Sequence, residues 1–86
     1  MDNFKGQVTR KIPAHILRME EEMKELVTRL EALFSFIDVD NPIYMGLSTM
    51  QKDLLSIQCD AMTAYNKILH VRIENEYNIL EASSKE

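Results

Sequence analysis

Residues 16–37, ILRMEEEMKELVTRLEALFSFI, decide the fold because their apolar side chains recur at steps of three and four positions. This spacing predicts an amphipathic helix whose apolar residues form the seam of a heptad repeat. Pro13 suits the first turn of such a helix, where its missing N–H would have no partner in any case. We therefore expect a helix over about residues 13–37. Its seam is Ile16, Met19, Met23, Leu26, Leu30, Leu33 and Ile37.

Polar residues flank this seam, and some of them have the spacing of helical ion pairs. Glu20 precedes Lys24 by four positions, and Glu25 precedes Arg29 by four. Opposite charges at this spacing lie on one face of a helix and stabilise it modestly. We expect both pairs on the solvated side of the first helix.

A second helical pattern follows a polar connection. Turn-forming residues cluster over about residues 38–47, which predicts a loop. Ser48 and Gln51 then have the spacing of a capping box, in which the Ser side chain caps the helix and the Gln side chain reaches back. The sequence predicts a second helix over about residues 48–81, followed by a frayed tail at 82–86.

The second helix carries two apolar stripes instead of one. Met50, Leu54, Ile57, Ala61, Ala64, Ile68 and Val71 form the first stripe. Leu55, Met62, Tyr65, Leu69, Ile73 and Leu80 form the second. One partner helix covers only one stripe, so we expect the other to meet further copies of the chain. The predicted fold is all-α: a single domain over residues 1–86, an antiparallel two-helix hairpin that assembles into an oligomeric helical bundle.

Composition limits the other classes of protein. The chain has 86 residues with a single cysteine, Cys59, so an internal disulfide is excluded and we expect a buried apolar filler. No stretch resembles a secretory signal or a membrane helix, which favours a soluble, cytoplasmic protein. His15 and His70 lack the spacing of zinc ligands, and no catalytic motif is present. We expect neither an enzyme nor a bound metal or cofactor.

Charge is distributed unevenly along the chain. Residues 1–18 carry a net charge of +3 and residues 19–86 a net charge of −7, which together give −4. An acidic chain is a poor candidate for binding duplex nucleic acid. Thr9, Arg10 and Lys11, however, precede the positive end of the first helix, where anions bind readily. Lys24 lies about three turns further on, too far to join them in one chain, but in an assembly it can face Arg10 of another copy. The alternative is a solvated basic end.

The same residues resemble a known family. The segment from Val8 to Leu33, VTRKIPAHILRMEEEMKELVTRLEAL, is similar to the first helix of the phage anti-CBASS cyclic-oligonucleotide sponges, whose hairpin is shared with phage Thoeris-inhibiting sponges. Arg10 falls on the family Arg, and the family's Lys-Glu-Leu and Glu-Ala-Leu motifs fall on residues 24–26 and 31–33. Gln58 and Met62 match a Gln-x-x-x-Met pattern in the second helix.

The resemblance implies a function as well as a fold. Such a sponge is a hexamer of hairpins that binds cyclic di- or trinucleotides such as cGAMP without cleaving them, so the host immune response stays off. The resemblance gives Lys24 a ligand contact and places Thr9 where the family has a base-stacking Tyr. The alternative is a structural or adaptor hairpin that docks on a partner protein through an apolar stripe, for example through Leu69 or Ile73.

Overall fold

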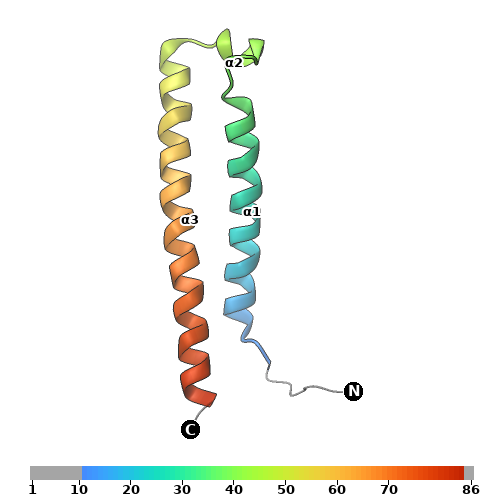
Figure 1. Ribbon diagram of the computed structural model, residues 1–86, viewed down its shortest axis with the longest axis vertical. Helices are drawn as coiled ribbons and strands as arrows, with labels where there is room; N and C mark the ends of the chain where they lie inside the picture. The colour runs from blue at the N-terminus through green and yellow to red at the C-terminus, as the bar shows by residue number, and fades with distance from the viewer. Residues whose placement is uncertain (1–10, 85–86) are drawn as a thin grey trace, which may run out of the picture.

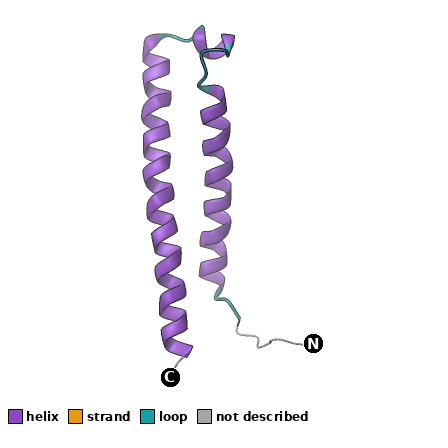
Figure 2. Cartoon of the chain, viewed as in Figure 1, coloured by secondary structure: helices purple, strands orange, loops and turns teal. Residues whose placement is uncertain are grey.

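The structure is a computed structural model that describes residues 11–84, and all regular structure in that range is helical. Helix α1 spans Ala14–Phe36, α2 spans Pro42–Met45 and α3 spans Thr49–Ser84 (Figures 1 and 2). The all-helical prediction is thus confirmed for these residues. The prediction of two helices is wrong, because the short helix α2 lies within the expected loop.

The two long helices lie side by side, with the start of α1 beside the later part of α3 (Figure 1). Two polar contacts join them there. His15 Nε2 lies 2.8 Å from Glu76 Oε1, and the Tyr77 hydroxyl donates to Glu20 Oε2 at 2.7 Å. The chain directions of α1 and α3 are therefore opposite, and α3 extends past the start of α1.

The core lies between α1 and α3 and follows the heptad seam of α1. Every seam residue from Ile16 to Ile37 is buried or partly buried, and the side chain of Ile16 is only 1% exposed. Leu26 packs with Leu69 and Ile73 of α3, and the partly buried neighbours of this cluster are Met19, Met23, Met62 and Tyr77. Cys59 is buried with a free thiol, as the filler prediction requires. The apolar spacing of α1 is thus explained by its contact with α3.

Only one of the two α3 stripes faces α1. Leu69 is 0% exposed and Ile73 is also buried. Docking on a partner protein through these two residues, the alternative drawn from the sequence, is therefore wrong for the folded single chain. The other stripe, which begins at Met50, is exposed along its length. Met50 is 66% exposed and is therefore not a core residue of the single chain.

The connection is ordered by short-range hydrogen bonds that account for α2. Asn41 Oδ1 accepts from the Ile43 N–H at 3.0 Å, and Pro42 occupies the first turn of α2. Asn at an N-cap followed by Pro is a strong helix start, because the cap satisfies a free N–H and Pro fixes φ. Asn41 Nδ2 also donates to the Phe36 carbonyl oxygen at 2.9 Å, which ties α2 to the end of α1. The expected turn therefore contains one helical turn.

The start of α3 has the predicted capping box. Ser48 Oγ accepts from the Gln51 N–H at 3.1 Å, and Gln51 Oε1 accepts from the Ser48 N–H at 2.8 Å. The helix then continues without a break to Ser84, three residues beyond the predicted end and into the tail expected to be frayed.

Candidate functional site

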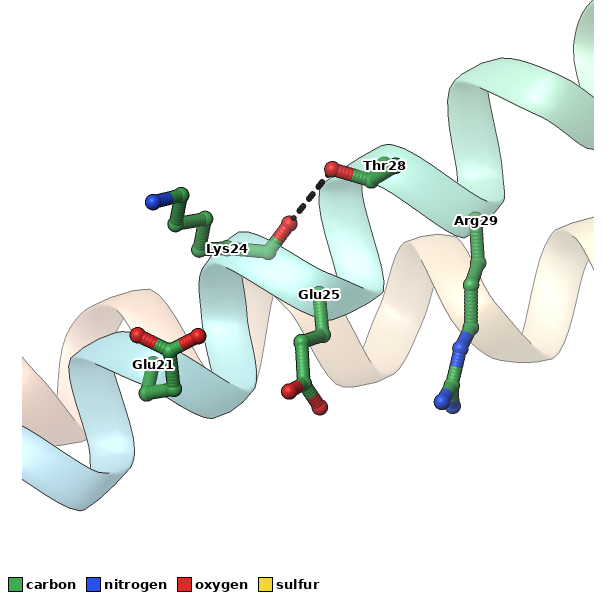
Figure 3. Close-up of a pocket in the computed structure, with 5 residues that line it drawn as sticks. All are labelled: Glu21, Lys24, Glu25, Thr28 and Arg29. Carbon is green, nitrogen blue, oxygen red and sulfur yellow. Dashed lines mark hydrogen bonds between the residues drawn. The ribbon is translucent and has the colours of Figure 1, made fainter.

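An open hollow of about 320 Å³ lies on the outer face of α1, around Lys24. Its lining residues come from two successive turns of the same helix: Glu21, Lys24, Glu25, Thr28 and Arg29. Figure 3 shows the Lys24 ammonium and the Arg29 guanidinium pointing in different directions from this surface. The Thr28 hydroxyl donates to the Lys24 carbonyl oxygen at 3.0 Å, which turns that hydroxyl toward the helix backbone.

The two cations of this hollow have no partner among residues 11–84. Neither Lys24 nor Arg29 forms a side-chain hydrogen bond or ion pair there, so the expected pairs with Glu20 and Glu25 do not form. The Glu20 carboxylate instead accepts a hydrogen bond from the Tyr77 hydroxyl. Glu21 and Glu25 nevertheless balance the two positive charges. The hollow of one copy is therefore close to neutral, and an anion would need further positive charge to bind tightly.

The other predicted site residues lie at the start of the chain. Thr9 and Arg10 are outside the described residues, and Lys11 is exposed just before α1. No side chain among the described residues caps the start of α1, where Pro13 is the N-cap residue. About 15 Å of helix separates this end of α1 from Lys24, at 1.5 Å per residue. Lys11 and Lys24 therefore do not share a pocket within one copy.

The contact between Tyr77 and Glu20 has an electrostatic consequence. The hydrogen bond to the Glu20 carboxylate raises the pKa of the Tyr77 phenol above its ordinary value of about 10. Burial and the negative charge of Glu20 act in the same direction. The phenol therefore stays protonated and keeps donating to Glu20, which holds the first turns of α1 against α3.

Comparison with known families gives a match over most of the chain. The Sequestin family model matches residues 13–75, which is most of the chain. The chain belongs to the Sequestin family. No curated protein and no solved structure matches it.

The Sequestin match covers α1, α2 and most of α3. Of the four predicted ligand-binding residues, Lys24 alone lies inside the matched segment, and the basic residues before Pro13 lie outside it. Arg29 also lies inside it, although the sequence pattern assigned Arg29 only to an ion pair. Its position five residues after Lys24, on the exposed side of a helix rich in glutamate, was the available signal.

A second, apolar hollow of about 360 Å³ lies where α1 ends and α3 begins. It is lined by Phe36, Leu47, Gln51, Leu54, Leu55 and Gln58. Gln58 Nε2 lies 3.8 Å from Met62 Sδ, so the Gln-x-x-x-Met pattern of the sequence is one contact along α3. Further along α3, Asn66 Oδ1 is buried without a hydrogen-bond partner. No pattern in the sequence indicates this apolar hollow, because it forms only where the ends of two helices meet.

Neither a metal site nor a membrane span is found in the described part of the chain. Residues 11–84 contain no group of three or more His, Cys, Asp or Glu side chains placed to hold a metal ion. None of the described helices is long and apolar enough to cross a lipid bilayer.

Proposed function

We propose that this chain is a phage anti-defence protein that binds a cyclic di- or trinucleotide such as cGAMP and sequesters it. The ligand is held without being cleaved, so the chain is not an enzyme, and the withdrawal of the messenger from the host cytoplasm blocks CBASS immunity. The observation that carries the proposal is the family match over residues 13–75, because the name Sequestin points to sequestration. Lys24 and Arg29 of α1, which have no partner within the described range 11–84, give that function a chemical basis.

The pocket of this proposal lies between copies of the chain. A cyclic dinucleotide carries two phosphates, and the hollow around Lys24 is close to neutral in one copy because Glu21 and Glu25 offset its cations. Arg10 and Lys11 of another copy would supply the missing positive charge, together with the free N–H groups at the start of its α1. The binding form is thus a homo-oligomer of antiparallel hairpins, and the family resemblance favours a hexamer.

The test is a thermal-shift panel of cyclic di- and trinucleotides with linear dinucleotides as controls. A ligand at 100 times its dissociation constant adds about 2.7 kcal/mol of stability per site. We expect a large shift with one cyclic class and none with the linear controls. Mass spectrometry of ligand released by heat should recover it intact. If no cyclic nucleotide shifts the unfolding midpoint, the proposal is wrong.

Charge variants then test the named residues. Arg10→Gln and Lys24→Gln each remove one charged contact, which costs about 1.5–3 kcal/mol, or roughly ten- to 150-fold in affinity. Arg72→Gln is the matched control, because Arg72 is exposed on α3 and outside the hollow. Isothermal titration that finds equal affinity in all three variants would assign the ligand to another surface.

A second candidate function rests on the exposed apolar stripe of α3. An adaptor hairpin would use such a surface to dock on a partner protein. Ile57→Asp places a charge within this stripe, where Ile57 is 62% exposed. An adaptor would lose its partner in this variant and bind no nucleotide in the panel.

A further inference from the structure

From Met50 to Val71, one face of α3 is apolar and uncovered in the single chain. Its large members are Met50, Leu54, Ile57, Ile68 and Val71, all more than half exposed, and the exposed Ala61 and Ala64 lie between them. Both α1 and α2 lie to the same side of α3 in Figure 2. The face repeats at alternating steps of four and three residues, which is the seam of a coiled coil and not a scatter of exposed apolar residues. In a coiled coil, such a seam is covered by another helix.

The order of sizes along this seam is self-complementary. Ala61 and Ala64 occupy its centre, Ile57 and Ile68 flank them, and Leu54 and Val71 lie outside these. Two antiparallel copies centred between residues 62 and 63 would pair each residue from Leu54 to Val71 with a counterpart of similar size, and Met50 would lie beside Asn75 of the other copy. The two alanines allow close approach of the backbones at the centre, and the larger side chains fill the space on either side.

Charges beside the seam favour the same arrangement. Asp60 and Lys67 flank it on one side, about 10 Å apart along α3 and so too distant to pair with each other. In the antiparallel register, Asp60 of each copy lies beside Lys67 of the other, which gives two attractive contacts. Neither Asp60 nor Lys67 has a partner among the described residues, so no contact within one copy competes with this pairing.

The balance of all flanking charges also separates the two directions. The antiparallel register adds a like-charge contact at each outer end, between Asp53 and Glu74, so its attractive and repulsive contacts are equal in number. The parallel register gives no attractive contact and places Lys67 beside Arg72 twice. Antiparallel packing also aligns the two helix dipoles favourably.

We propose that the uncovered face of α3 is the interface with a second copy of this chain. The two α3 helices pack antiparallel about a two-fold axis, with Leu54 against Val71, Ile57 against Ile68 and Ala61 against Ala64. The opposite face of α3 carries Leu69 and Ile73 and stays packed on α1. The interface leaves the hollow around Lys24 open. It forms without any nucleotide, so it stands or falls independently of the proposed ligand.

A charge exchange tests the interface and its register in the nucleotide-free protein. Asp60→Lys and Lys67→Asp each turn two attractive contacts into two repulsive ones, which should raise the dimer dissociation constant about tenfold. The double variant restores the attraction with the signs exchanged and should return to within about threefold of the original. Asp40→Lys makes the same charge change in the exposed connection and should have no effect. Sedimentation equilibrium measures all four variants beside the unaltered chain.

Cysteine cross-linking tests the direction in a Cys59→Ala background. Residues 57 of two antiparallel copies lie about 16 Å apart along the axis, beyond the reach of a disulfide. Ile57→Cys and Ile68→Cys chains should therefore form a disulfide when mixed and none when oxidised separately. Disulfides in each separate sample would mean parallel packing. A monomeric unaltered chain, or a double charge variant that stays as weak as the single ones, would also overturn the proposal.

Discussion

The Tyr77 hydroxyl and the Glu20 carboxylate form a polar contact between the long helices, near the start of α1. Tyr77 is partly buried against the core cluster, so its ring packs on apolar side chains while its hydroxyl reaches Glu20. Glu20 was the acid expected to pair with Lys24, which has no partner among residues 11–84. A long-range contact thereby leaves a cation free on the surface.

Tyr77→Phe should change how stability depends on alkaline pH. The folded state raises the pKa of this phenol, so it binds the proton more tightly than the unfolded chain does. The resulting stability is fully present below about pH 10 and is lost as the pH rises above that value. Removing the hydroxyl removes this loss. Thermal unfolding at about pH 8 and pH 11 should therefore show a smaller decrease in midpoint for the variant, and an equal decrease would contradict the role given to the contact.

At the scale of single elements, the start of α3 depends on the reciprocal hydrogen bonds of Ser48 and Gln51. Ser48→Ala leaves the Gln51 N–H without its acceptor and should lower the free energy of unfolding by about 0.5–2 kcal/mol. Ser56→Ala is the matched control, because Ser56 is exposed within the same helix, where alanine is the better helix former. Urea denaturation of both variants measures the difference, and equal midpoints would mean that the cap contributes no stability.

Local signals account for what the sequence predicted correctly at this scale. The seam of α1 and the capping box of α3 depend on residues a few positions apart, so both were readable from the chain alone. The choice between the two α3 stripes was not, because both are apolar at helical spacing and only packing on α1 distinguishes them. The short α2 was missed because Asn41 and Pro42 are typical of a turn as well as a helix start.

The candidate site divides in the same way. Lys24 lies on an exposed hollow, and its contact with a ligand stays a prediction. The lack of an ion pair between Lys24 and Glu20 was not predictable, because Tyr77, which binds Glu20 instead, lies 57 positions further along the chain than Glu20. The charge balance of the hollow likewise needed the fold, which brings Arg29 and two acids to the same surface as Lys24.

At the scale of the whole molecule, two neighbouring residues of α3 have different roles, one in the core of the single copy and the other on the face proposed for assembly. Leu69 is 0% exposed against α1, whereas Ile68 is 57% exposed on the face proposed to meet a second copy. A chain of this size buries only about 60% of its unfolded surface, so contacts within one copy leave it marginally stable. Association adds stability that grows with protein concentration, because it favours the folded state by mass action.

Leu69→Ala and Ile68→Ala should therefore differ in their dependence on concentration. Leu69→Ala removes core packing within each copy and should cost about 2–5 kcal/mol whether the copies are associated or separate. Ile68→Ala should lower the unfolding midpoint only at concentrations where the unaltered chain is associated, because its side chain is exposed when copies are separate. Differential scanning calorimetry over a hundredfold concentration range, about the span needed to populate both states, measures both effects. If Ile68→Ala were equally destabilising in dilute solution, Ile68 would stabilise the single copy, and the exposed face of α3 could not be what holds the copies together.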